Sequence, residues 1–188
     1  MAIDRRTLLA DTALGVLADQ GIRGLTHRAV DRAAALPEGT TSAYFRTRSA
    51  LLTAVVRRLV ELDQGELHRA AERFPPPRTP AELVDGLAAL ARQRLEGEGR
   101  RRSLARAACA VESVRDPELR EILHPRENPG RDAVRRLLAA HRVPDVEARV
   151  LTLLACFDGL VLDALLVGGR PEVARTSLEG LVVAALRP

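Results

Sequence analysis

The stretch that decides the fold runs from Gly21 to Leu52 and reads GIRGLTHRAVDRAAALPEGTTSAYFRTRSALL. Thr26 can cap a helix through its hydroxyl, and apolar residues then recur at helical spacing, which predicts a first helix over residues 26–36. Pro37 disfavours the helical conformation in the residue before it, so we expect a turn there and a second short helix over residues 40–45. Two such helices make a helix-turn-helix, whose second helix enters the major groove of DNA.

This spacing resembles that of the TetR-type bacterial transcriptional regulators. The resemblance is close over roughly the first 60 residues, from an expected helix at about residues 5–20 onward. Beyond them only the length and the helical pattern are similar. The matching positions are Gly21, Thr26, Val30, Ala33, Ala34, Leu36, Gly39, Thr40, Tyr44, Phe45, Arg48 and Leu51. The alternative is an unrelated helical domain that happens to contain a helix-turn-helix.

Several positions depart from the pattern of the family that the stretch resembles. Ala35 stands where the family usually has the turn glycine, and Pro37 stands where it has a capping serine. Glu38 replaces a common lysine, and Ser42 and Ala43 replace aromatic or imidazole side chains. These departures concern the base sequence that is read more than the fold.

The charge distribution separates one end of the chain from the rest. Residues 1–60 hold 9 Arg against 5 acidic residues, whereas residues 61–188 hold 20 of each, so the whole net charge of +4 lies at the helix-turn-helix end. A basic head joined to a neutral body is typical of a protein that binds DNA phosphates with the head alone. Ordinary variation of surface charge is the alternative reading.

Composition predicts an all-α protein in one compact body with a small head. Of the 188 residues, 46% are hydrophobic and only 2% aromatic, so the core must be built from Leu, Val and Ala. Cys109 and Cys156 lie in apolar helical runs and are expected to be free, which fits a cytoplasmic location. The N-terminus has no apolar signal-peptide region. Residues 150–167 are apolar, but Asp158 and Asp163 disfavour a membrane span there.

Helix-breaking prolines and glycines divide the rest of the chain into further helices. We expect helices over residues 48–74, 79–97, 101–114, 116–123, 132–142, 145–167 and 171–186. The helix over residues 48–74 is expected to be the only continuous connection between head and body. The predicted domains are a DNA-binding domain over 1–47 with its motif at 26–45, the connecting helix over 48–74, and a ligand-binding and dimerisation domain over 75–188.

Residues of the head fall into three expected roles. Side chains near helix starts and at the end of the second helix are expected to contact phosphates, and these are Thr26, Arg28, Tyr44 and Arg48. Side chains at the front of the second helix are expected to read bases, and these are Glu38, Thr40, Thr41 and Ser42. The Glu carboxylate can accept from a cytosine amino group, and a Thr methyl can meet a thymine methyl. His27 is either a phosphate contact or a surface residue, and Phe45 is expected in the core.

The last two helices are expected to form a dimer interface. Apolar residues surround the helix over 145–167, and a helix that is apolar on every side must be covered on every side. Two copies of the last two helices can form an intermolecular four-helix bundle, as the resemblance also implies. The expected interface residues are Phe157, Leu162, Leu178, Leu181 and Val182. In the alternative reading, both helices only complete the core of the monomer.

The resemblance implies a pocket for a small-molecule effector in the body. Polar or soft residues that interrupt apolar runs are candidates for its lining, namely Cys109, Glu112, Cys156 and Asp158. Each has a structural alternative, such as an ion pair with Arg or a buried packing position. Few aromatic residues are present to stack on a planar ligand, and the sequence does not identify the effector.

These observations predict a homodimeric transcriptional regulator, a repressor that an effector releases from a palindromic double-stranded operator. A constitutive or architectural helix-turn-helix protein without an effector is the first alternative. An enzyme is the second, but His68, His124 and His141 have no second metal ligand at helical spacing, and the chain contains no Gly-rich phosphate loop, GxSxG or CxxC. No metal, cofactor or membrane partner is expected.

Overall fold

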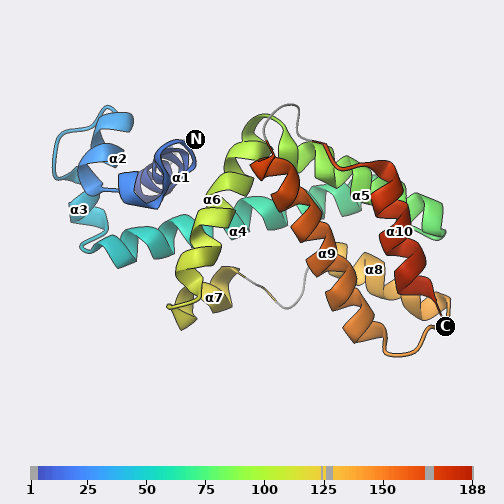
Figure 1. The fold of residues 1–188 in the computed structure, drawn as a ribbon. Coiled ribbons are helices and arrows are strands. Elements are labelled where there is room, and N and C mark those ends of the chain that lie inside the picture. Colours follow the sequence, from blue (N-terminus) through green and yellow to red (C-terminus); the bar gives the residue numbers. More distant parts are fainter. Residues whose placement is uncertain (1–3, 124, 126–128, 168–171, 188) are drawn as a thin grey trace. The chain divides into compact units, whose positions relative to one another are not determined.

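A computed structural model describes residues 4–123, 125, 129–167 and 172–187 of the chain (Figure 1). Ten α-helices and no strand lie within these residues, so the all-α prediction is confirmed. The helices are α1 (Arg5–Gly24), α2 (His27–Ala33), α3 (Thr40–Tyr44), α4 (Arg48–Arg73), α5 (Pro80–Leu95), α6 (Gly97–Ser113), α7 (Pro117–Leu123), α8 (Pro129–Ala140), α9 (Val146–Leu166) and α10 (Arg175–Leu186). None of the described helices is both long enough and apolar enough to span a bilayer.

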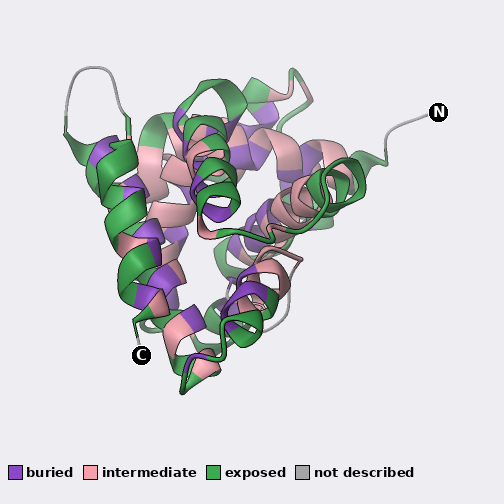
Figure 2. Cartoon of the chain, turned by 90° about the vertical axis from the view of Figure 1, so that its right-hand side faces the viewer, coloured by how far each residue is buried: buried purple, intermediate pink, exposed green. Residues whose placement is uncertain are grey.

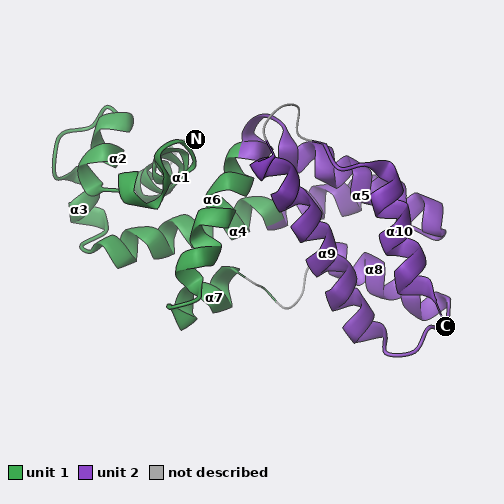
Figure 3. Cartoon of the chain, viewed as in Figure 1, with its two compact units in different colours: residues 1–63, 101–125 green, residues 64–100, 126–188 purple. Residues whose placement is uncertain are grey.

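The chain divides into two compact units whose boundaries differ from the expected domains (Figure 3). Unit 1 comprises residues 1–63 and 101–125, and unit 2 comprises residues 64–100 and 126–188. Helices α6 and α7 therefore belong largely with the helix-turn-helix. Both α4 and α6 have residues in each unit, so the expectation that α4 is the only continuous connection is wrong. Helical periodicity predicts that α6 exists, but it carries no information about which helices pack against it.

The core of unit 1 joins the helix-turn-helix to α4, α6 and α7. Aliphatic side chains from all of these helices are buried together with one aromatic ring. Figure 2 marks the buried positions along the ribbon. The largest contributors are Leu9, Leu17, Leu25, Val30, Phe45, Leu51, Val55, Leu59, Leu119 and Leu123. Phe45 is 4% exposed, which confirms its expected place in the core. The head is thus held by apolar burial that includes residues far along the chain.

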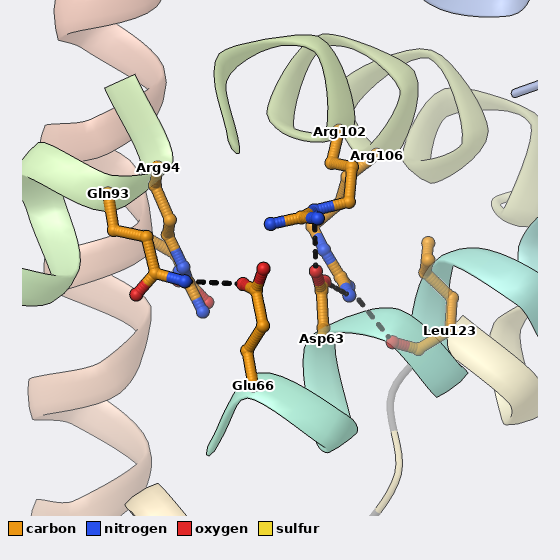
Figure 4. Close-up of polar contacts among 8 residues, drawn as sticks. Asp63, Glu66, Gln93, Arg94, Arg102, Arg106 and Leu123 are labelled. Atoms are coloured by element: carbon orange, nitrogen blue, oxygen red, sulfur yellow. Dashed lines mark hydrogen bonds and ion pairs between the residues drawn. The ribbon is translucent and has the colours of Figure 1, made fainter. Parts of the chain in front are cut away.

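Ion pairs reinforce the same helices of unit 1. The carboxylate of Asp63 in α4 pairs with Arg102 and Arg106 of α6, and Arg106 also donates to the Leu123 carbonyl at 3.2 Å (Figure 4). Arg58 in α4 donates two hydrogen bonds to Asp11 in α1, at 2.6 and 3.2 Å. Because half-buried side chains make these contacts, α1, α4, α6 and α7 are linked by charge as well as by packing.

Unit 2 is a helical layer made mainly of α5, α8, α9 and α10. Helix α10 packs against α5 and α9, and α9 also packs against α5 and α8. Their core is almost entirely aliphatic around the buried ring of Phe157. Arg94 lies over that ring, 5.4 Å from its centroid, and pairs with Asp158 at 2.6 Å. In the same unit, the Gln93 amide donates to the Glu66 carboxylate (Figure 4).

Most helix ends lie within a few residues of the expected positions, and the differences have local causes. Helix α2 ends at Ala33 because Ala35 takes a left-handed conformation, so the helix is shorter than expected. Helix α6 begins at Gly97, four residues before its expected start, because the left-handed Gly97 (φ 49°) starts the helix rather than ending the previous one. Helix α10 begins at Arg175, and the expected start at residue 171 lies outside the described residues.

Candidate nucleic-acid interface

The turn before the recognition helix α3 is fixed by the carboxylate of Asp31, which is almost completely buried. One carboxylate oxygen accepts from the Gly39 N–H at 2.9 Å. The other accepts from the Thr41 N–H at 2.7 Å and from the Thr41 hydroxyl at 2.5 Å. Gly39 has a φ of 91°, a backbone conformation that residues other than glycine rarely adopt. This conformation turns its N–H toward the carboxylate. Asp31 thereby anchors the start of α3 to α2.

The charge state of Asp31 follows from these contacts. Burial by itself raises the pKa of the Asp31 carboxyl, but the hydrogen bonds from Thr41 and Gly39 outweigh it and hold the pKa below the ordinary value. Asp31 is therefore ionised at neutral pH, and its charge is balanced by fixed hydrogen-bond donors. Sequence reasoning missed this residue because an Asp inside an amphipathic helix suggests a solvent-facing position.

Ala35 ends α2 with an unusual backbone conformation. Its φ is 53°, in the left-handed region, and the next N–H, from Leu36, donates back to the Asp31 carbonyl at 2.9 Å. This is the arrangement in which a helix normally ends on glycine. The turn therefore keeps the conformation of a glycine turn although the sequence has an alanine there, and the cost is local strain.

Substituting Ala35→Gly is expected to relieve that strain. The variant should be more stable by about 1 kcal/mol, because glycine has no Cβ to clash in the left-handed region. In a chain of this size, such a gain raises the melting temperature by about 2–4 °C, measurable by thermal unfolding followed by circular dichroism. A melting temperature that stays the same or falls would show that Ala35 carries no such strain.

The structure corrects the expected role of Thr41. This residue is 0% exposed, and both its N–H and its hydroxyl bind Asp31. A side chain that is fully buried in the head cannot reach a base edge, so Thr41 belongs to the anchor of α3. The expectation treated all residues at the front of α3 alike, whereas only one side of a helix faces outward.

His27 also has a structural partner. Its Nε2 lies 2.6 Å from the carbonyl oxygen of Phe45, and since a carbonyl only accepts, Nε2 carries the proton. His27 therefore ties the start of α2 to the end of α3. Thr26 precedes it as the N-cap of α2 and accepts from the Ala29 N–H at 3.2 Å, which confirms the expected cap. Both side chains are used within the head.

The side chains left on the outer surface are fewer than expected. Glu38, Ser42 and Tyr44 are exposed, Thr40 is half-buried, and Arg28 is exposed on α2. Within the described part of the chain, no ion pair or hydrogen bond engages the Arg28 guanidinium. These residues remain the candidates for DNA contact, with Arg28 as the phosphate-binding cation.

Arg48 is held at the start of α4 by its own chain. Its guanidinium donates to the Ile22 carbonyl at 2.5 Å, which links α4 to the end of α1. Thr47 caps α4 by accepting from the Ala50 N–H at 3.0 Å. Arg48 is exposed, so it can still meet a phosphate, but part of its hydrogen-bonding capacity fixes the helix ends.

An open groove of about 470 Å³ lies beside the start of α4 in unit 1. Its lining includes the hydroxyls of Thr47, Ser49 and Thr53 and the guanidinium of Arg6, which lies 5.0 Å over the centroid of the Phe45 ring. Sequence reasoning did not single out Arg6, because nothing in the sequence of α1 indicates a partner in α3. The lining also includes Arg57 and the acidic Glu118, so the groove carries charges of both signs.

The four expected ligand-pocket residues are not brought together within one unit. Cys109 is buried in the core of unit 1, where burial raises the pKa of its thiol to about 12, and Glu112 is half-buried on the same helix. Cys156 and Asp158 are exposed on α9 in unit 2, and Asp158 pairs with Arg94. The expected alternative for Asp158 was a close helix crossing at Asp158 and Gly159, and the structure instead shows its carboxylate in an ion pair with Arg94.

The expected interface residues divide into two groups. Phe157, Leu178 and Val182 are buried inside unit 2 by their own chain, so they support the helices and cannot contact a partner directly. Leu162 is 42% exposed, and Leu181 is half-buried. Periodicity identified the apolar helices but did not distinguish their inner side from their outer side.

Comparison with known proteins assigns the chain to a family. The family model described as "Tetracyclin repressor-like, C-terminal domain" matches residues 78–188, more than half of the chain. The chain therefore belongs to the TetR family of transcriptional regulators, a family whose members are generally not enzymes. A search of the curated proteins finds no match.

Solved structures agree with this assignment over nearly the whole chain. A transcriptional regulator from Rhodococcus sp. Rha1 is 25% identical with a TM-score of 0.78, over 97% of this chain and 96% of that chain. A TetR-family member from Streptomyces coelicolor A3 is 26% identical with a TM-score of 0.71, over 99% of both chains. The multidrug binding protein EbrR, complexed with ethidium, is 28% identical with a TM-score of 0.71, over 98% and 99%.

Proposed function

We propose that this protein is a homodimeric repressor that a small-molecule effector releases from a palindromic DNA operator. The observation that carries the proposal is the anchored recognition helix: Asp31 fixes the start of α3 while the opposite side of α3 stays exposed, in the part of the chain that holds the whole net positive charge. Because its target is chromosomal DNA, we place the protein in the cytoplasm.

The outer side of α9 and α10 supports the dimer. On α9, Leu151, Leu162 and Leu166 are exposed and recur at helical spacing, with Leu166 75% exposed. Val183 is exposed on α10, which packs beside α9 in the same unit. Exposed large apolar side chains that recur at helical spacing, as on α9, are typical of a protein–protein contact. A two-fold dimer would present two recognition helices to successive major grooves.

The effector remains a proposal supported by relatives. EbrR is described as a multidrug binding protein in its complex with ethidium, and a putative regulator from Saccharomonospora viridis, 16% identical, is in complex with choline. We propose a small organic effector for this chain as well. Helices α4 and α6 each have residues in both units, so a ligand-induced shift of either helix is a route by which unit 2 can change the head spacing.

Arg28→Ala is expected to weaken binding to all DNA sequences alike. The exposed guanidinium replaces a counterion at one phosphate in each head, so its loss should reduce the salt-dependence slope of log K by about 0.9 per head. Binding titrations at several salt concentrations, on an operator and on an unrelated duplex, measure the slope. A changed sequence preference at an unchanged slope would contradict the phosphate role.

The proposed function is tested by titrating the full chain with the DNA upstream of its own gene and with a shuffled duplex of equal composition. A regulator should prefer the upstream DNA by a large factor, with one dimer per inverted repeat, and a screen of metabolites should contain compounds that release it. Equal affinity for both duplexes would favour the architectural alternative. Specific binding that no compound weakens would favour a constitutive repressor.

A further inference from the structure

The exposed side of α3 has a defined centre. In an α-helix each residue turns by about 100°, so Ala43 lies about 200° round from the buried Thr41, on the opposite side of the helix. Ala43 is exposed, and so is its neighbour Ser42. Thr40 lies on the same side one turn earlier. Ala43 is therefore the residue that a helix inserted in a groove brings closest to the bases.

The hydroxyl groups beside Ala43 have already used their protons. The Thr40 hydroxyl donates to the Pro37 carbonyl at 2.7 Å, and the Ser42 hydroxyl donates to the Gly39 carbonyl at 2.8 Å. Each oxygen keeps lone pairs that can accept a further hydrogen bond. To donate to a base, either hydroxyl would first have to give up a bond that the chain already makes.

The remaining polar group at the front of α3 is also an acceptor. Glu38 is exposed, and an ionised carboxylate has no proton to donate. No Arg, Lys, Asn or Gln side chain is present between residues 38 and 45. Arg and Lys are the residues that usually donate to guanine O6 and N7, and Asn and Gln are those that usually bind adenine N6 and N7. The exposed residues on α3 and in the turn before it thus offer acceptors and methyl groups, and we name this set the acceptor face: Glu38, Thr40, Ser42 and Ala43.

We propose that the acceptor face reads amino groups of cytosine and adenine together with thymine methyls, and makes no direct hydrogen bond to guanine. The proposal rests on the DNA-binding function proposed above and specifies what that site recognises. Guanine presents only acceptors, N7 and O6, in the major groove, and these oppose the oxygens of the face. Cytosine N4 and adenine N6 are donors, and the Ala43 methyl matches the C5 methyl of thymine. Ala43 is the central specificity-determining residue.

Donors near the acceptor face are assigned to phosphates. Tyr44 on α3 and Arg28 and Arg32 on α2 carry exposed donors. Substituting Tyr44→Phe should therefore lower the affinity for every sequence by a similar factor and leave the preferred sequence unchanged. A changed preferred sequence in this variant would contradict the proposal, because the phenol would then be reading a base.

The test begins by selecting duplexes from a randomised library with the full chain. In the selected half-site, uracil in place of the contacted thymine should weaken binding by about fourfold per half-site, the value of one buried methyl group. Replacing the guanines by 7-deazaguanine, which lacks the N7 acceptor, should leave the affinity within about twofold. Weakening of more than about tenfold by 7-deazaguanine would overturn the proposal.

Three variants assign the effects to residues. In Ala43→Gly the uracil penalty should disappear, whereas Ala43→Ser retains the Cβ and should keep it. Each penalty is a ratio measured within one protein, so any loss of helix stability cancels. Glu38→Gln should relax the preference for cytosine at one position per half-site; an unchanged preference there, or a uracil penalty that persists in Ala43→Gly, would overturn the proposal. Enrichment of no sequence at all would overturn the DNA-binding function itself, and the proposal with it.

Discussion

Asp31→Ala is expected to lower the stability of unit 1 by about 3 kcal/mol, because it leaves the buried N–H and hydroxyl of Thr41 without an acceptor. The recognition helix then loses its anchor, and each head must reorder α3 before it can bind. We expect operator affinity to fall by about 100-fold or more. Chemical unfolding and DNA titration measure the two effects.

Controls separate this anchor from other effects of removing a carboxylate. Asp85 in unit 2 pairs with Arg175 at 2.7 Å on an exposed surface, so Asp85→Ala should change stability by less than about 0.5 kcal/mol. Thr41→Val removes only the hydroxyl and should cost less than Asp31→Ala while leaving the preferred DNA sequence unchanged. Full operator affinity in Asp31→Ala would contradict the anchoring role.

The dependence of the free energy of unfolding on pH in the acid range is an independent test of the role of Asp31. Its folded pKa lies below the ordinary value of 3.8, so the carboxylate stabilises the head fully above that pH. The contribution is lost as the pH falls from about 3.8 through the folded pKa. In Asp31→Ala this part of the acid dependence should be missing, which unfolding curves across that range would detect.

Leu162→Arg is expected to dissociate the dimer while leaving each chain folded. Leu162 is exposed in the single chain, so an arginine there costs the monomer little, but burying two unpaired charges in a two-fold interface costs several kcal/mol. Light scattering should then report 20.4 kDa in place of twice that mass. Because one head contacts few bases, operator affinity should fall by about 100-fold or more.

The matched control is Val114→Arg, which introduces the same charge at an apolar residue of unit 1 that is 72% exposed. It should remain a dimer with normal operator affinity. A dimer of unchanged stability in Leu162→Arg would place the interface elsewhere. A monomeric unmutated protein that still binds a palindrome with full affinity would contradict the dimer proposal altogether.

The local structure of the head could largely be predicted from the sequence. Thr26 caps α2 as expected, Thr79 begins the helix expected from residue 79 by capping α5, and α4 ends one residue before its predicted end. Caps, prolines and apolar periodicity act over a few residues, so a single sequence is enough to identify them. Pro37 also predicts a turn after α2, but the sequence does not predict the left-handed conformation of Ala35.

Contacts between distant residues could not be predicted. The partner of Asp31 is ten residues away across a turn, and the partners of Asp63 are on α6, about forty residues along the chain. The burial of Thr41, Phe157 and Val182 depends on which side of each helix is covered. The spacing of apolar residues in the sequence does not identify that side. For this reason the predicted DNA and dimer residues include side chains that face inward.

The most direct test of ligand-released DNA binding is the affinity of a releasing compound measured with and without operator. Linkage requires that the compound weaken DNA binding by the same factor by which DNA weakens compound binding, typically about 5- to 150-fold. Calorimetry on the free protein, on the operator complex and on the protein with a shuffled duplex supplies the three affinities. We predict a reduced affinity in the operator complex alone. Equal affinities in all three would contradict ligand-released repression and leave a DNA-binding protein whose ligand has no regulatory effect.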